Sequence, residues 1–351
     1  MTAGLARGFA SDNFAGAHPE VMAALSAAND GHAQAYGADP WTASCLERFR
    51  SAFGTEARAF PVFNGTGANV VCLRAALRPF EAVICPATAH LAVDECGAPE
   101  ALAGVKLLTV ECADGKLTPA HVEPVLERIG DEHAVQPRLV SISNSTELGT
   151  VYSVAEVQAL ADFARSLGLL LHVDGARLAN AAASSGVPLA ALTAEAGVDL
   201  LSFGGTKSGL LFGEAVVVFG EALGEGLEFV RKQSMQLASK MRFLSAQLLA
   251  LLSDELWLRN ARHANEMARR LGDAVASVDG VSLAQPVEAN AVFAALPRDA
   301  ISRLLESLPG DLPFYVWEER ADVVRWMCSW DTTEEDVDGF VEAVRRAVGP
   351  A

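Results

Sequence analysis

The stretch Leu171-His172-Val173-Asp174-Gly175-Ala176-Arg177 joins the end of an apolar run to a glycine and the start of a helical pattern. An apolar strand that ends in an acid places that acid at the carboxyl edge of a sheet, where open α/β folds bind their ligands. Asp174 could there pair with a cationic ring nitrogen. It could equally cap the helix that follows, since Asp favours the N-cap position. The segment by itself indicates a binding site and a helix cap about equally.

A second apparent strand end presents a lysine in a glycine-rich turn, Ser202-Phe203-Gly204-Gly205-Thr206-Lys207-Ser208-Gly209. Such a lysine suits Schiff-base chemistry, although taken alone a surface lysine is the commoner case. Lys207 follows Asp174 by 33 residues, and one βαβ unit has about that length. The acid and the amine are therefore expected at neighbouring strand ends. Pyridoxal phosphate requires this pair, with the lysine on its aldehyde and the acid near its ring nitrogen.

Two further segments could complete the site. Phe63-Asn64-Gly65-Thr66-Gly67-Ala68-Asn69 precedes a helical pattern, and a Gly/Thr loop that opens a helix can bind an anion through its backbone N–H groups. An ordinary helix start is the alternative, and the loop lacks the third glycine of a dinucleotide fingerprint. His90 follows another apparent strand. It could stack on a flat ring, accept a proton, or have no special role.

Short apolar runs alternate with helical patterns around these segments. Their near-continuous Val, Ile and Leu content is typical of parallel strands buried on both faces. The alternation predicts right-handed βαβ crossovers and an open α/β sheet. Strands are predicted at residues 82–85, 105–110, 138–143, 169–173, 198–203 and 215–219.

The two ends of the chain follow other patterns. Residues 1–45 are rich in polar and turn-forming residues and predict an extended arm. Long helices are expected over residues 224–274, then strands and a closing helix, Glu334–Val348, which together predict a small α+β domain. We therefore expect an N-terminal arm and large α/β domain over residues 1–257, and a small C-terminal domain over residues 258–351.

Composition excludes several classes of protein. The 351 residues carry a net charge of −17, which disfavours binding to nucleic acid and anionic membranes but leaves room for a local positive pocket. The six cysteines contain no CxxC pair, so reduced thiols and no metal site are expected. Residues 1–10 lack a signal-peptide pattern, and no apolar run reaches about 18 residues. A cytoplasmic protein is expected.

A series of short motifs supports a resemblance to a known family. In chain order they are Ser-Asp-Asn from residue 11, Tyr-Gly-x-Asp from 36, Gly-Thr-x-Ala-Asn from 65, Ala-His from 89, His-x-Asp-Gly-Ala-Arg from 172, and the lysine turn. The chain resembles the low-specificity L-threonine aldolases, in the β-eliminating lyase branch of the fold-type-I pyridoxal-phosphate enzymes. The resemblance runs from about Ser11 to Asp331. It implies an aspartate aminotransferase-like α/β fold with a mostly parallel sheet in the large domain.

The resemblance also implies roles for single residues. Lys207 would hold the cofactor through a Schiff base, and Asp174 would hold its ring nitrogen. His90 would stack over the ring and assist proton transfer. The residues implied for the cofactor phosphate are Gly65, Thr66 and Thr206, while Arg177 belongs to both the cofactor and the substrate sets. Ser11, Arg177 and Arg325 would bind the substrate carboxylate, which the guanidinium fork matches.

Further residues are implied for the pocket and the interface. His133 matches a family histidine near the substrate hydroxyl, so the loop from Gly130 to Gln136 would approach the site. Tyr36 resembles a pocket residue. The family places its site at a dimer interface, so a homodimer or homotetramer is expected. Arg242, or else Lys240, could reach the partner's phosphate, although a surface role suits either residue.

The chain departs from the family pattern at two places. Some relatives carry an Asn-Thr-His run where this chain has Asn144-Ser145-Thr146-Glu147-Leu148-Gly149, and the lysine turn differs from the Ser-Lys-Gly of several members. Both segments are expected in the walls of the site. The departures bear on substrate preference more than on cofactor use.

The implied reaction is retro-aldol cleavage of L-threonine, L-allo-threonine or a related 3-hydroxy-α-amino acid, such as phenylserine, to glycine and an aldehyde. His90 or His133 would take the hydroxyl proton. β-Elimination or transamination on the same fold is the nearest alternative, since wall residues decide which bond breaks. A nicotinamide-dependent dehydrogenase is disfavoured by the incomplete glycine fingerprint. A non-catalytic protein would make the Asp174–Lys207 pairing a coincidence.

Overall fold

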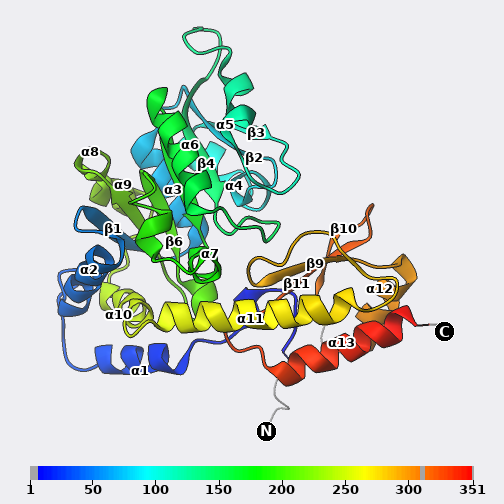
Figure 1. The fold of residues 1–351 in the computed structure, drawn as a ribbon. Helices are drawn as coiled ribbons and strands as arrows, with labels where there is room; N and C mark the ends of the chain where they lie inside the picture. The colour runs from blue at the N-terminus through cyan, green and yellow to red at the C-terminus, as the bar shows by residue number, and fades with distance from the viewer. Residues whose placement is uncertain (1–6, 309–312, 350–351) are drawn as a thin grey trace.

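Seven strands form the central sheet of the computed structural model, which describes residues 7–308 and 313–349 (Figure 1). The strand order is β1-β7-β6-β5-β4-β2-β3. β7 pairs antiparallel with β1 and β6, and the other neighbours are parallel. The strand bounds are β1 Ala57–Val62, β2 Glu81–Pro86, β3 Lys106–Val110, β4 Gln136–Ser143, β5 Leu170–Gly175, β6 Leu200–Gly204 and β7 Glu214–Phe219. The six predicted strands and the mostly parallel α/β fold are confirmed.

Helices cover both faces of this sheet because successive side chains of each strand point to opposite sides. In β7, Ala215 and Val217 belong to the core under α2, α6, α7 and α10, whereas Val216 and Val218 belong to the core under α3 and α9. The helix bounds are α2 Pro40–Phe53, α3 Gly65–Ala76, α6 Val154–Ser166, α7 Leu178–Ser185, α9 Leu227–Gln233 and α10 Met241–Leu252. Shorter helical segments are η1 Asp12–Phe14, α4 His90–Val93, η2 Pro99–Ala103, α5 Pro119–Val122, η3 Glu123–Leu126, η4 Leu189–Leu192, η5 Thr206–Ser208 and α8 Glu221–Gly224.

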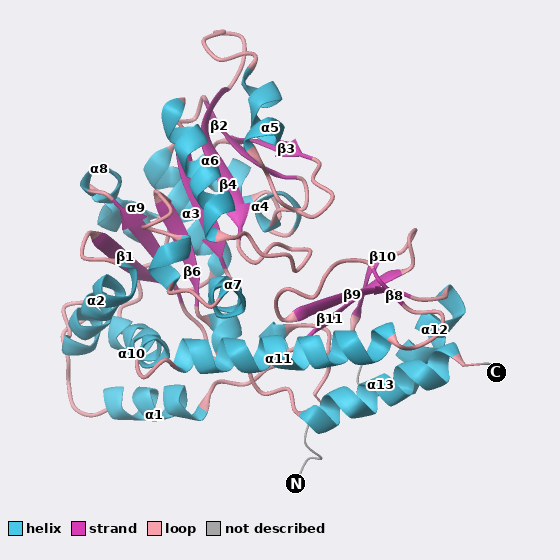
Figure 2. Ribbon diagram, in the orientation of Figure 1, coloured by secondary structure: helices cyan, strands magenta, loops and turns pink. Residues whose placement is uncertain are grey.

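A smaller antiparallel sheet follows along the chain, in the order β10-β11-β9-β8. It packs against α11, α12 and α13 (Figure 2). The buried Trp326 lies in this core, with its ring edge-on to Phe314 and Phe340. The bounds are α11 Leu256–Ala276, β8 Ser282–Leu283, β9 Ala291–Ala295, α12 Arg298–Ser307, β10 Tyr315–Glu318, β11 Val323–Met327 and α13 Glu334–Val348. We keep the domain division at residues 257 and 258 as a proposal, because α11 runs across it.

The prediction of an extended arm over residues 1–45 is wrong for much of that segment. η1, α1 (Pro19–Ala28) and the start of α2 lie in it, and residues 1–6 lie outside the described part of the chain. Each of the two longer helices has a proline at its first position. The residue before that proline, His18 or Asp39, is the N-cap, and its side chain accepts an N–H of the first helical turn. A capping residue followed by proline is an ordinary signal of a helix start. The helices were missed because many turn-forming residues surround these two signals.

Candidate active site

The carboxyl ends of three neighbouring strands bring the predicted acid and amine together. Ser143 at the end of β4 pairs in register with Asp174 of β5, which pairs with Ser202 of β6. Lys207 follows β6 in η5. One cavity at this sheet edge is lined by Gly65, Asn69, His90, Ser143, Ser145, Glu147, Asp174, Ala176, Arg177 and Lys207. The structure thus gathers four of the predicted site residues, and their near neighbours, around the lysine.

Lys207 is a partly buried amine rather than an exposed surface lysine. Burial, reinforced by the charge of Arg177, lowers its pKa. The carboxylates of Asp12, Asp174 and Glu214 oppose this shift. A lowered pKa makes the neutral amine, the nucleophilic form, more available near neutral pH.

Asp174 is held by a chain of polar side chains. Asn69 Nδ2 donates to Asp174 Oδ2 at 2.9 Å and to Glu95 Oε1 at 2.7 Å. Glu95 Oε1 also lies 2.9 Å from His90 Nδ1. Asp174 Oδ1 accepts the Ala176 N–H, but α7 begins at Leu178. Asp174 is therefore not the helix cap that the sequence alone allowed.

His90 lies at the start of α4, and its side chain is 39% exposed. The hydrogen bond to Glu95 is the largest influence on its pKa and raises it, against the effect of burial. Glu95 is fully buried, so it fixes one edge of the imidazole in the cavity wall. The charged form of the ring is thereby favoured.

Two arginines approach the site, but they are not equally free. Arg177 donates through Nε and Nη2 to Asp12 at 2.7 and 2.9 Å. The guanidinium that was expected to bind the substrate carboxylate therefore already binds a carboxylate of the chain. Arg325 lies over the rings of Tyr315 and Trp317 and donates one bond, from Nη2 to the Ala10 carbonyl. Its buried Nε has no partner. Burial and the nearby Arg177 lower the pKa of Arg325 to about 10.

Ser11 and Thr206 were expected at the site, but neither lines the Lys207 cavity. Ser11 Oγ accepts the Asn13 N–H as the cap of η1. Thr206 Oγ1 accepts the Gly213 N–H at 3.1 Å, and its hydroxyl also bonds the Glu214 carboxylate. Both side chains stabilise the local backbone instead of facing the Lys207 cavity.

The expected phosphate loop opens α3. Asn64 caps the helix by accepting the Gly67 N–H at 2.7 Å. A side chain added at Gly65 would meet no atom within 4 Å, so the space beside the first turn is open. Gly67, in contrast, is covered by the Gln236 side chain. The start of this helix, where N–H groups can bind an anion, therefore meets the cavity at Gly65, whereas Thr66 does not line it.

His133 does not reach this site within one chain. Its backbone N–H donates to Asp131, in an exposed loop just before β4 begins at Gln136. The site lies at the other end of β4, and eight residues at roughly 3.3 Å each separate the two ends. The expected approach of loop 130–136 is wrong for the single chain, because motif order does not reveal which end of a strand a loop occupies.

Tyr36 and Arg242 also lie away from the cavity. Tyr36 is 54% exposed, with Lys232 Nζ 5.0 Å from its ring centre. Arg242 stacks on Trp41 and Phe243 and donates to the Gly31 carbonyl. Neither side chain lines the Lys207 cavity.

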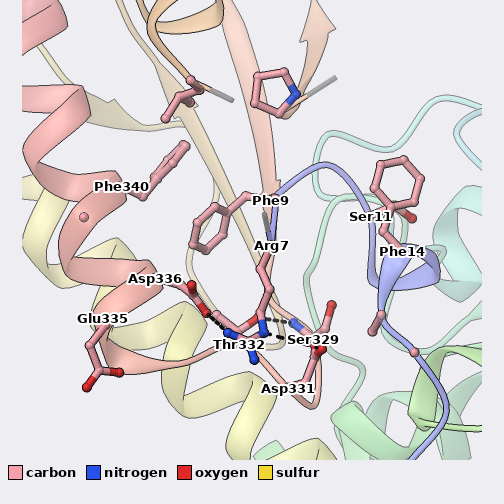
Figure 3. Close-up of a pocket in the computed structure, with 16 residues that line it drawn as sticks. Arg7, Phe9, Ser11, Phe14, Ser329, Asp331, Thr332, Glu335, Asp336 and Phe340 are labelled. Carbon is pink, nitrogen blue, oxygen red and sulfur yellow. Dashed lines mark hydrogen bonds and ion pairs between the residues drawn. The ribbon is translucent and has the colours of Figure 1, made fainter. Parts of the chain in front are cut away.

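A larger cavity, of about 720 Å³, lies between the N-terminal arm and α13 (Figure 3). Arg7 forms ion pairs across it with Asp331 and Asp336. Ser11 belongs to this cavity. Its described lining contains no lysine or histidine, so the chemistry points to the smaller Lys207 cavity instead.

Sequence reasoning missed four site residues: Asp12, Asn69, Glu95 and Glu147. Asp12 and Asn69 stand inside the quoted motifs, so attention to the other polar residues of each motif could have found them. For Glu95 the sequence offers only its closeness to His90, and for Glu147 only its place in the run 144–149 that departs from the family pattern. Their roles depend on contacts across 26 to 57 residues.

The fold and the lysine–carboxylate cavity define an enzyme of the aspartate aminotransferase-like class. Aspartate aminotransferase from Thermus thermophilus shares this fold, with a TM-score of 0.68 at 17% identity over 95% of this chain and 89% of that one. A threonine aldolase from Leishmania major superposes with a TM-score of 0.91 at 33% identity, over 97% of this chain and 99% of that one.

Sequence comparison identifies the family within that class. The model of the beta-eliminating lyase family matches residues 8–298. A low specificity L-threonine aldolase from Pseudomonas aeruginosa is 46% identical over 97% of this chain and 98% of its own length. One from Pseudomonas sp. (strain NCIMB 10558) is 46% identical over 96% of both chains. The chain belongs to the threonine aldolases, within the beta-eliminating lyase family.

Proposed function

We propose that this chain cleaves L-threonine, L-allo-threonine or a related 3-hydroxy-α-amino acid, such as phenylserine, to glycine and an aldehyde, with pyridoxal phosphate as cofactor. The observation that carries the proposal is the meeting of Lys207 and Asp174 at adjacent strand ends in one cavity. The 46% identity to low specificity L-threonine aldolases supports it over nearly the full length.

The cavity fits pyridoxal phosphate. A partly buried amine, a buried carboxylate and the open first turn of α3 match the aldehyde, ring nitrogen and phosphate of that molecule. Two residues of the cavity wall also carry buried polar atoms without partners, Ser145 Oγ and Glu147 Oε2. Arg325, near Arg177 but outside the lining, carries a third at Nε. Such atoms are costly unless a ligand completes their hydrogen bonds.

When bound, the cofactor supplies an electron sink for the electron pair released by bond cleavage. Lys207 would hold it covalently, and Asp174 would keep its ring nitrogen charged. Asn69 orients the Asp174 carboxylate for this contact. The N–H groups at the start of α3 would bind the phosphate.

Substrate binding falls to the two arginines. Arg325 has a free buried donor, and Arg177 lines the cavity with Asp12 neutralising part of its charge. Together they would fix the substrate carboxylate and so orient the bonds at Cα for cleavage. His90 would stack over that ring. Its raised pKa favours the charged form, which donates a proton more readily than it accepts one.

Assembly and location complete the proposal. Tyr36, which is exposed, and Arg242, which is partly exposed, are suited to complete a neighbouring subunit's site, so we propose a homodimer or homotetramer with its sites at the dimer interface. The six free cysteines, five of them buried, agree with a reducing compartment such as the cytoplasm. No helix within residues 7–308 and 313–349 is both long and apolar enough to cross a membrane.

β-Elimination and transamination remain the chemical alternatives, because the same cofactor serves them. The test is to supply pyridoxal phosphate and L-threonine, or phenylserine, and to measure glycine and the aldehyde together. Equal amounts of both, lost in Lys207→Ala, are expected. Pyruvate or another keto acid in place of glycine would overturn the proposed reaction.

A further inference from the structure

The loop after β4 places an unexplained carboxyl group in the cavity wall. Glu147 lines the same cavity as Lys207 and His90. Its Oε1 accepts the Ser143 hydroxyl at 2.6 Å and the backbone N–H of His90 at 3.0 Å. Its Oε2 is buried with no partner. The carboxyl group is therefore anchored through one oxygen, and the other oxygen is able to accept further hydrogen bonds.

The surroundings of Glu147 are those of a proton acceptor. The terminal torsion of a glutamate is broad, so either oxygen can turn toward the cavity. Ser145 Oγ, in the same wall, also lacks a partner. Burial is the largest influence on the pKa of Glu147 and raises it, and Asp174 adds to the shift. A buried carboxylate of this kind is a stronger base than an exposed one.

We propose that Glu147 binds the β-hydroxyl of the substrate and takes up its proton when the Cα–Cβ bond breaks. The inference rests on the proposed function and deepens it, because it names the group that recognises a 3-hydroxy substrate. Ser143 and the His90 backbone hold Glu147 in position.

The step balances within the active site. The hydroxyl proton passes to Glu147, the O–H electron pair forms the aldehyde C=O bond, and the Cα–Cβ pair remains on the Cα side, where the bound cofactor accepts it. Protonation of Cα then gives glycine, and Glu147 loses its proton. One proton leaves the substrate and one returns, so no oxidant, reductant or net acid is required.

His90 is less suited to this task. Its Nδ1 faces Glu95, and this contact favours the protonated ring. Glu147, in contrast, contacts Ser143 and the backbone of His90. Its charged neighbours are Asp174 and Arg177, from the next strand and the turn after it. Two further titratable groups, Cys85 and Tyr152, also lie near it.

The test compares two reactions of the holoenzyme. Cleavage of L-threonine or phenylserine requires loss of the hydroxyl proton, whereas exchange of the glycine α-proton with deuterated water does not involve a hydroxyl group. Glu147→Gln, which keeps the size of the side chain, should lower kcat for cleavage about 100-fold or more. Glycine exchange should change less than about threefold, since a lost base affects only the step that uses it.

The matched control is Glu288→Gln. Glu288 Oε2 accepts the Val151 N–H at 2.7 Å, so it supports the chain just beyond the same loop without lining the cavity. It should leave both reactions unchanged. Glu147→Asp, which retains the carboxylate, should recover part of the cleavage rate that Glu147→Gln loses.

The outcomes separate the inference from the proposed function. Normal cleavage by Glu147→Gln, or an equal loss of cleavage and glycine exchange, would overturn the role of Glu147 as proton acceptor. A wild-type enzyme that exchanges the glycine proton but cleaves no 3-hydroxy amino acid would instead overturn the proposed function.

Discussion

The ion pair between Arg177 and Asp12 joins the N-terminal arm to the site, and replacing Asp12 with Asn tests its contribution. The Asp12 side chain is 1% exposed and that of Arg177 16%. Burial raises the pKa of Asp12, but the charge and hydrogen bonds of Arg177, helped by Lys207 and Asn290, outweigh it and lower the pKa from 3.8 to about 2. Each pKa unit corresponds to about 1.4 kcal/mol, so the ionised Asp12 in these surroundings contributes about 2.5 kcal/mol at neutral pH.

Asp12→Asn should cost somewhat more than this, about 3 kcal/mol, because it leaves a buried guanidinium without its counter-charge. The assay is urea-induced unfolding at fixed protein and cofactor concentrations. A carboxyl group with a lowered pKa stabilises the fold above its unfolded pKa and loses that effect as pH falls. The difference between wild type and variant should therefore be full at pH 7 and shrink as pH falls from about 4 toward 2.

The exposed pair of Arg128 and Asp131 provides the control. Asp131→Asn should leave the unfolding midpoint unchanged, since exposed ion pairs contribute little. An Asp12→Asn variant as stable as the wild type at pH 7, or a difference that does not depend on pH, would refute the reasoning. A larger fall in the pKa of Lys207 should accompany the variant, because Asp12 opposes that fall in the wild type.

Three further predictions concern other parts of the molecule. Burial raises the pKa of Glu214 to about 7, so the free energy of unfolding should fall by about 3 kcal/mol as pH rises from 4.5 through 7. Glu214→Gln should remove this loss in unfolding experiments on the cofactor-free protein between pH 5 and 8, and an unchanged pH profile would contradict the assignment. Trp326→Ala should destabilise the protein by about 3–5 kcal/mol in the same assay, because the fully buried indole fills the core of the smaller sheet; a loss below 1 kcal/mol would show that this core can collapse around the gap. If His90 stacks on the cofactor, His90→Ala should weaken cofactor binding about two- to tenfold, as expected for the loss of one aromatic pair, whereas His90→Phe should bind almost normally; equal Kd values for the two variants in cofactor titrations would exclude stacking.

The sequence predicted that Asp174 and Lys207 meet in one cavity because the signal was local. Asp174 and Lys207 each follow an apolar strand, and parallel strands bring their carboxyl ends to one edge. Both positions could be inferred without knowing any side-chain contact. The strand β1 was missed because Arg58 and Pro61 interrupt its apolar pattern.

The periphery of the site could not be predicted in the same way. The bond between Arg177 and Asp12 spans 165 residues, and nothing near Arg177 in the sequence indicates that its guanidinium is already engaged. Thr206 stands beside the lysine as a phosphate ligand would, yet its hydroxyl holds Gly213 and Glu214. Residue type and spacing reveal which groups are near a site, whereas hydrogen-bond partners decide which of them are free.

The reversed direction of β7 has a consequence for the lysine. Gly204 at the end of β6 pairs in register with Glu214 at the start of β7, and Glu214 also binds the Gly205 N–H. The intervening turn is thus a closed loop tied at both ends to the middle of the sheet. If Lys207 holds the cofactor as proposed, only the side-chain torsions of the lysine would let its amine move away on release. The amine would then stay at a high effective concentration beside the site, so reattachment would be an intramolecular event.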